Sequence, residues 1–312
     1  MEGTAPRILK TFFIASTGIS QLLYAVPSLN NGMRAYGARS QLQDQAADGS
    51  RPVAEKPAPK EDTPWEKVVK YMSGLRVPHS WFTGFYIWSS ICSAVWGQQL
   101  YTRGPLLQLV AKYTDYAGKP SMSFNQIILV WGLFQFQGLR RLYESFAFSK
   151  ASKSTMNMAI FSIGIAYYAS MSVSMWIEGL PALMSTPNPL GNATLSAPSI
   201  RSIIGIPLFL LASGLQYDCH YYLWSLKKYT FPTHPAFSKV LNPHYLAEVL
   251  IYVSLAILGA PKGQILNRSL VAGTFFVLAN LAAEADNSKT WYKQKFGEDK
   301  VQGKYRIIPY IW

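Results

Sequence analysis

The chain has 312 residues, of which 49% are hydrophobic and only 14% are charged. Soluble domains average about 25% charged residues, so this composition excludes an ordinary water-soluble domain. The net charge is +13, but the basic residues lie at the ends of apolar runs, where they would contact lipid headgroups rather than nucleic acid. The two cysteines, Cys92 and Cys219, show neither metal-ligand spacing nor a disulfide framework, so we expect two buried thiols and no metal site.

Seven apolar runs follow one another along the chain, most of them close to the roughly 20 residues that cross about 30 Å of hydrocarbon. We therefore expect an all-α integral membrane bundle of seven transmembrane helices. The first run lacks a clear signal-peptide cleavage site and is predicted to be retained as a span. The predicted spans are residues 8–28, 81–101, 124–139, 155–177, 203–219, 245–260 and 270–285.

One polar stretch, residues 39–64, interrupts this pattern after the first span. It is rich in Ala, Pro, Gln, Lys, Glu and Asp, which cannot bury a core, so it is predicted to be a mobile linker. The chain then divides into a first transmembrane helix with its flank, residues 1–38, the linker, and a six-helix core, residues 65–312.

The distribution of basic residues predicts the orientation. With the N-terminus on the lumenal side, the cytosolic segments carry 21 of the 29 Lys and Arg residues, as the positive-inside rule requires. A glycosylation sequon at Asn192 falls in a predicted lumenal loop, and a second one at Asn267 falls on the same side. We therefore expect a lumenal N-terminus and a cytosolic C-terminus.

Polar side chains in the fifth and sixth runs are candidates for a site, because such groups are costly inside a membrane unless they face a cavity or a partner. Gln216 and His220 are four residues apart, and Lys227 lies near the same helix face two turns later. His244 and Glu248 form a second such pair. Each set has a structural alternative: a lone histidine is usually a satisfied core residue, and Glu248 could cap the sixth helix in its first turn.

Two further groups lie at the ends of the third and seventh runs. Arg140 and Glu144 can pair along the helix, with Arg140 expected at the membrane interface and Arg141 expected to reach inward. In the last run, Asn280 is expected to hydrogen-bond across helices. The polar residues after it are Glu284, Asp286, Asn287, Lys289 and Tyr292.

Several stretches together resemble the polyprenol reductase branch of the steroid 5α-reductase family. They span nearly the whole chain in the family's order, although the linker at 39–64 has no counterpart. The motifs that carry the resemblance are Leu139-Arg140-Arg141-Leu142-Tyr143-Glu144, Gln216-Tyr217-Asp218-Cys219-His220 with Leu226-Lys227-Lys228, Asn242-Pro243-His244-Tyr245-Leu246-Ala247-Glu248, and the ending Trp291-Tyr292 with Ile307-Ile308-Pro309-Tyr310-Ile311-Trp312.

The resemblance implies a reductase of the endoplasmic reticulum membrane that binds NADPH between its C-terminal helices and cytosolic loops. By position, His244 and Glu248 would be catalytic and would lie near the nicotinamide. The family is rich in Arg and His just before its F-Y pair, whereas residues 284–289 here offer only Lys289 for phosphate. The residues expected to hold the cofactor are Gln216, His220, Lys227, Lys228, Arg141, Asn280, Lys289 and Tyr292.

The implied reaction saturates the α-isoprene double bond of a polyprenyl lipid in dolichol synthesis, which serves protein N-glycosylation. Hydride addition to an allylic alcohol leaves the new charge unstabilised, whereas a conjugated aldehyde accepts it as an enolate, so polyprenal is the expected substrate. A steroid or enoyl-thioester reductase, a methyltransferase that uses S-adenosylmethionine, and a non-enzymatic lipid-binding or transport protein remain alternatives. The oligomeric state is left open.

Overall fold

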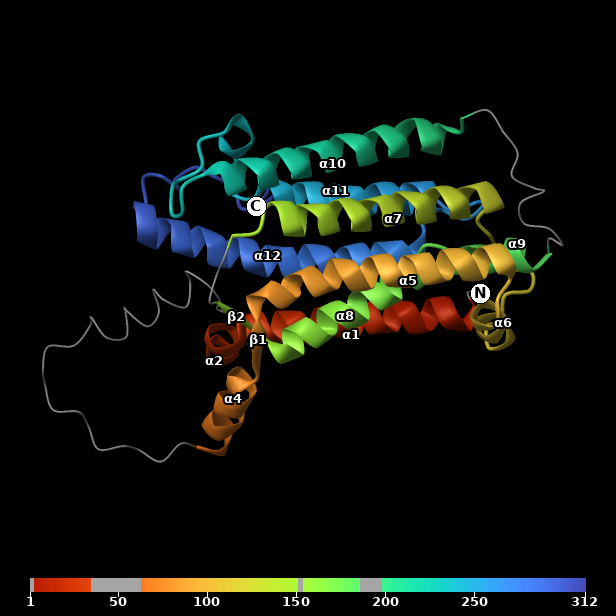
Figure 1. Ribbon diagram of the computed structural model, residues 1–312, viewed down its shortest axis with the longest axis horizontal. Coiled ribbons are helices and arrows are strands. Elements are labelled where there is room, and N and C mark those ends of the chain that lie inside the picture. The colour runs from red at the N-terminus through yellow and green to blue at the C-terminus, as the bar shows by residue number, and fades with distance from the viewer. Residues whose placement is uncertain (1–2, 35–62, 151–153, 186–197) are drawn as a thin grey trace, which may run out of the picture.

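The computed structural model describes residues 3–34, 63–150, 154–185 and 198–312. Long helices lie side by side and alternate in direction, so that the chain begins at the right-hand end of the bundle and α12 finishes at the left-hand end (Figure 1). The long helices are α1 (Thr4–Ala25), α5 (Phe82–Thr102), α7 (Phe124–Ala147), α8 (Met158–Ser174), α10 (Ile200–Ser225), α11 (Pro243–Leu258) and α12 (Arg268–Phe296).

These helices coincide with the seven predicted runs, but among the described residues only four helical segments are long and apolar enough to cross a membrane. They are Thr4–Ala25, Met158–Ser185, Ile200–Ser225 and Arg268–Phe296. Large apolar side chains on them point outward: Ile14 is 65% exposed and Leu211 is 74% exposed. Because such surface is unfavourable in water, the chain is a multi-pass membrane protein.

The all-α prediction is wrong in one detail, because two short strands pair beside the bundle. β1 (Arg76–Pro78) and β2 (Thr155–Asn157) are antiparallel, with Val77 opposite Met156. Both of these side chains are buried. A three-residue strand is too short for its alternating pattern to be recognised in the sequence. The helix predicted to begin at residue 155 therefore begins after β2, at Met158.

Short elements close the two ends of the bundle. Helix α4 begins with a capping box in which Thr63 accepts from the backbone of Glu66 and Glu66 accepts from that of Thr63. The predicted linker lies largely outside the described residues. The short elements are α2 (Pro27–Leu29), η1 (Asn30–Arg34), α4 (Pro64–Gly74), η2 (His79–Trp81), α6 (Pro105–Lys112), η3 (Ile177–Gly179), α9 (Leu180–Ser185) and η5 (Pro235–Phe237).

The core lies between the helices and combines aliphatic side chains with large aromatic ones. Phe13, Trp176 and Phe209 are fully buried. Helix α10 packs against α11, with Gly205 so close to Leu258 that an added Cβ would lie 2.6 Å from its side chain. Of the two thiols predicted to be buried, Cys219 is buried, whereas Cys92 is half-buried.

Candidate active site

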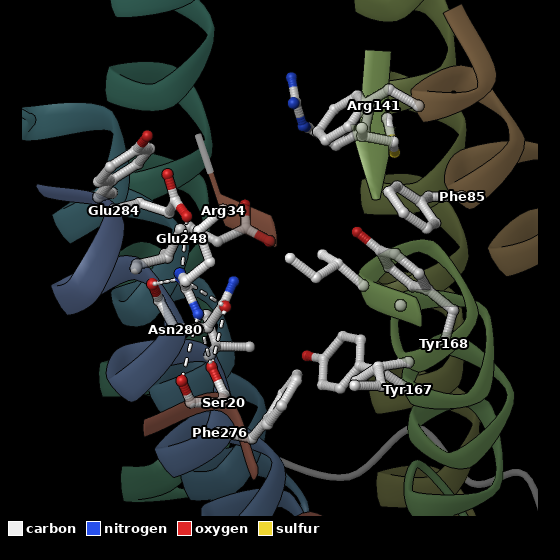
Figure 2. A pocket seen from close by; sticks show the side chains of 18 of the residues that line it. Ser20, Arg34, Phe85, Arg141, Tyr167, Tyr168, Glu248, Phe276, Asn280 and Glu284 are labelled. Atoms are coloured by element: carbon white, nitrogen blue, oxygen red, sulfur yellow. Dashed lines mark hydrogen bonds and ion pairs between the residues drawn. The ribbon is translucent and has the colours of Figure 1, made fainter. Parts of the chain in front are cut away.

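A cavity of about 280 Å³ lies between the helices at the end of the bundle where α1, α7, α10 and α12 finish. Its mouth and walls combine charged groups with aromatic and aliphatic ones (Figure 2). The polar lining comprises Ser20, Arg34, His79, Arg141, Asn157, Gln216, His220, His244, Glu248, Asn280 and Glu284, and the aromatic lining comprises Phe82, Phe85, Tyr86, Tyr167, Tyr168, Tyr245, Tyr252 and Phe276.

The carboxylate of Glu144 organises one wall. Its side chain is 1% exposed and accepts hydrogen bonds from the guanidinium groups of both Arg140 and Arg141. His220 Nδ1 lies 2.7 Å from Glu144 Oε2 and 2.8 Å from Arg141 Nη1. Since a carboxylate only accepts, a proton on Nδ1 would be donated to Glu144, which would leave Nε2 of His220 as an acceptor.

A second series of polar contacts connects Arg140, a partner of Glu144, to Glu248. Gln216 is 2% exposed, and its amide donates to Glu248 Oε2 while its carbonyl oxygen accepts from Arg140. Gln137 Nε2 lies 3.1 Å from Gln216 Oε1 and 3.4 Å from Glu248 Oε2. The expectation that Arg140 lies at the membrane interface is therefore wrong, because its guanidinium has three inward partners in Glu144, Gln137 and Gln216.

Glu248 and His244 occupy the first turns of α11, and both line the cavity. The alternative that Glu248 caps this helix is wrong, because α11 begins at Pro243 and its first turn carries no acidic residue. The His244 ring centroid is 5.4 Å from that of His220. His244 Nδ1 is buried and has no hydrogen-bond partner among the described residues, so it can bind a polar group that enters the cavity.

The opposite wall contains an arginine that the sequence did not single out. Arg34, in η1, is 3% exposed, and its Nη2 lies 2.9 Å from Glu284 Oε1 and 3.1 Å from Asn280 Oδ1 (Figure 2). Ser20 on α1 also donates to Asn280 Oδ1, at 3.2 Å. The predicted cross-helix role of Asn280 is thus confirmed. Arg34 was missed because a basic residue after a first span resembles an ordinary flanking charge.

Tyrosines were also missed, although they contribute most of the hydroxyl groups of the cavity. Arg141 Nη2 donates to the Tyr86 hydroxyl oxygen at 2.7 Å. The hydroxyls of Tyr167 and Tyr168 point into the cavity from the wall that faces Asn280 (Figure 2). At the rim, burial lowers the pKa of His79, which favours its neutral form. Within an apolar run, aromatic residues look like core, so only the fold distinguishes them.

Four of the predicted cofactor residues do not line the cavity. Lys227 and Lys228 follow the end of α10 and are exposed. Lys289 Nζ donates to the carbonyl oxygen of Lys304 at 2.7 Å, and the Tyr292 ring packs against Phe231 at 5.5 Å. These lysines lie beyond the cavity at the same end of the bundle, so their role toward a phosphate stays a prediction.

Comparison with known proteins finds a family match and relatives for this chain. Residues 183–312, which include α10, α11 and α12, match the family described as 3-oxo-5-alpha-steroid 4-dehydrogenase. Over most of its length the chain is similar to the polyprenal reductase of Saccharomyces cerevisiae, at 28% identity over 81% of this chain and 82% of the yeast protein. It is likewise similar to the polyprenal reductases of Xenopus tropicalis, at 29% identity over 66% of this chain and 68% of the relative, and of Homo sapiens, at 27% over 70% and 73%.

The segment that matches the family supplies the α10, α11 and α12 walls of the cavity, and the preceding part of the chain, including α1, η1, α5, α7 and α8, supplies the larger share of its lining. Residues 183–312 therefore carry a domain of the steroid 5α-reductase family, and the similarity of most of the chain to polyprenal reductases points to a reductase that acts on a carbon–carbon double bond.

Proposed function

We propose that this protein reduces the α-isoprene double bond of polyprenal with NADPH, in the synthesis of dolichol for protein N-glycosylation. The observation that carries the proposal is one cavity in which a polar wall with Glu248 and Asn280 faces a wall that combines Arg141 with the aromatic side chains of Tyr167 and Tyr168 (Figure 2). The names of the relatives support the same substrate.

The residues present fit a nicotinamide cofactor. A carboxamide needs an acceptor for its N–H groups and a donor for its oxygen, and the cavity offers the Glu248 carboxylate and the unpartnered Nδ1 of His244. His220, Gln216, Arg141 and Asn280 would complete the contacts. When bound, the reduced nicotinamide supplies a hydride to the substrate. Lys227, Lys228, Lys289 and Tyr292 remain our candidates for the phosphate-bearing end.

The remaining lining suits an isoprenoid chain. Phe82, Phe85, Phe276 and Val277 present apolar surface to the cavity, and burial of a methylene group there contributes about 0.8 kcal/mol. The conjugated aldehyde is favoured over the alcohol, since hydride addition to its β-carbon places the negative charge on an oxygen that hydrogen-bond donors can stabilise. His244 and Glu248 would hold the reacting groups in line.

The proposal includes a location and an orientation. We place the protein in the endoplasmic reticulum membrane with seven spans, a lumenal N-terminus and a cytosolic C-terminus. An odd number of spans agrees with an α1 that begins at one end of the bundle and an α12 that finishes at the other (Figure 1). The cavity then opens toward the cytosol, where NADPH is available.

The test is product formation by the purified protein in detergent micelles. Polyprenal, polyprenol, an enone steroid and an enoyl thioester are each supplied with NADPH, and the lipids are analysed by mass spectrometry. We expect a gain of two hydrogens in polyprenal alone. Saturation of the steroid or of the thioester in preference to polyprenal would contradict the proposal, as would binding of S-adenosylmethionine in place of NADPH.

A further inference from the structure

One hydroxyl group in the cavity is held by a charged donor. Tyr86, on α5, is 6% exposed, and its oxygen accepts a hydrogen bond from Arg141 Nη2 at 2.7 Å. Arg141 in turn donates through Nη1 to the buried carboxylate of Glu144. No acceptor for the Tyr86 proton is found in the part of the chain that the structure describes. The O–H group of Tyr86 is therefore available to a bound molecule.

This arrangement strengthens Tyr86 as a donor. A hydroxyl that accepts a hydrogen bond from a guanidinium group is polarised, and hydrogen bonds in such chains reinforce one another. Glu144 fixes Arg141, and Arg141 fixes the Tyr86 oxygen, so the donor is in place before the reaction begins. Donors that need no reorganisation are the most effective at stabilising charge that develops on an oxygen.

We propose that Tyr86 is a catalytic residue, which donates a hydrogen bond to the aldehyde oxygen and stabilises the enolate; this inference rests on the proposed function. A hydride from the reduced nicotinamide, which leaves oxidised, forms the new C–H bond at the β-carbon. The C=C electron pair moves to the bond between the α-carbon and the carbonyl carbon, and the C=O pair moves to oxygen. A proton from water then adds to the α-carbon and the C=O bond re-forms. Tyr86 keeps its proton throughout.

Two other tyrosines are the natural competitors for this role. The hydroxyls of Tyr167 and Tyr168 also point into the cavity (Figure 2). Neither receives a hydrogen bond from a charged donor within the described residues, so neither is polarised as Tyr86 is. The difference between Tyr86 and Tyr168 is therefore the Arg141 contact, and it can be tested by the same substitution at both positions.

The experiment compares Tyr86→Phe with wild-type protein in micelles, with NADPH and a three-isoprene α,β-unsaturated aldehyde as substrates. Loss of one oxyanion donor lowers kcat by about 100- to 1000-fold, and we expect a fall of that size with little change in KM. Tyr101→Phe is the matched control, since Tyr101 lies on the same helix and is 65% exposed. NADPH affinity and the thermal unfolding midpoint should be unchanged in both variants.

A binding measurement provides a second readout. The three-isoprene carboxylic acid carries negative charge where the enolate oxygen forms, so its inhibition constant should rise about tenfold or more in Tyr86→Phe and stay constant in Tyr101→Phe. A Tyr86→Phe protein with wild-type kcat and inhibition constant would overturn the inference and leave the proposed function standing. A large loss in Tyr168→Phe alone would do the same. Absence of turnover by wild-type protein would overturn both.

Discussion

Arg34 Nη2 lies 2.9 Å from Glu284 Oε1, and this buried ion pair joins η1 to α12 across 250 residues of sequence. Arg34 also donates to Asn280 Oδ1, at 3.1 Å, and to Ser20 Oγ, at 3.0 Å. All four residues line the cavity. The first helix is therefore part of the wall of the active site, and its docking onto α12 determines the shape of that site.

The ion pair predicts a large cost for the loss of one partner. Glu284→Gln removes the negative charge beside a guanidinium that is 3% exposed, and an unpaired buried charge costs about 3–5 kcal/mol. We expect the thermal unfolding midpoint in micelles to fall by about 2–4 °C for each kcal/mol lost. Glu298→Gln is the control, because Glu298 pairs with Lys293 on the surface, where both side chains are more than half exposed.

A double-mutant cycle identifies the origin of that effect. Arg34→Met removes the cation, and the double variant with Glu284→Gln should be more stable than the sum of the two single losses predicts, because neither charge is then left alone. Strictly additive losses would show that the two residues act independently.

The position of His220 in the cavity predicts that its loss weakens cofactor binding. His220→Ala removes an imidazole that contacts Glu144 and Arg141 and lines the cavity. A hydrogen bond to a charged group contributes about 1.5–3 kcal/mol, so NADPH affinity should fall about 10- to 150-fold. His234→Ala provides the comparison, because His234 lies outside the cavity. Equal NADPH affinities in the two folded variants would show that His220 has a structural role and does not contact the cofactor.

For Glu248 we predict a different result, namely a lower rate of hydride transfer. In Glu248→Gln an amide replaces the carboxylate that accepts from Gln216 Nε2, and it can still accept that bond with its oxygen. The protein should therefore fold, while the reacting groups shift, and misplacement by about 1 Å can cost about 100-fold in rate. Single-turnover NADPH oxidation measures the loss, and thermal unfolding verifies the fold. A normal oxidation rate would place the reaction centre elsewhere.

The sequon at Asn267 is predicted to carry no glycan. Asn267 is 0% exposed, its Oδ1 accepts from the Leu270 backbone at 2.9 Å, and its Nδ2 donates to the Gly259 carbonyl at 2.9 Å. Asn267→Ala should therefore cost about 1–2 kcal/mol of stability through the lost helix cap, without a change in glycosidase-sensitive mobility. Ser269→Ala destroys the same sequon, and because the Ser269 hydroxyl has no partner among the described residues, it should leave both properties unchanged.

The polar positions inside apolar runs were the most informative part of the sequence. Because such groups must face a cavity or a partner, Gln216, His220, Glu248 and Asn280 could be predicted to point inward, and all four line one cavity. The seven apolar runs likewise predicted the long helices. The orientation of the chain in the membrane stays a prediction. The sequon at Asn192 also stays a prediction, since Asn192 lies outside the described residues.

The remaining parts of the site could not be predicted, for physical reasons. A helix that is apolar on every face has no periodicity to show which side lines a cavity, so Tyr167 and Tyr168 on α8 could not be separated from core residues. The direction of Arg140 depends on Gln216, a partner 76 residues away. The position of Arg34 beside Glu284 could not be predicted, because it depends on the packing of α1 against α12.

The most direct test of the proposed function follows a labelled hydride. Purified protein is incubated with polyprenal and NADPH deuterated at either face of nicotinamide C4, and the product is analysed by mass spectrometry and nuclear magnetic resonance. We expect a saturated aldehyde that carries one deuterium, at the β-carbon, from one of the two labelled cofactors, and one solvent-derived hydrogen at the α-carbon. Deuterium at the carbonyl carbon, with the double bond intact, would contradict it.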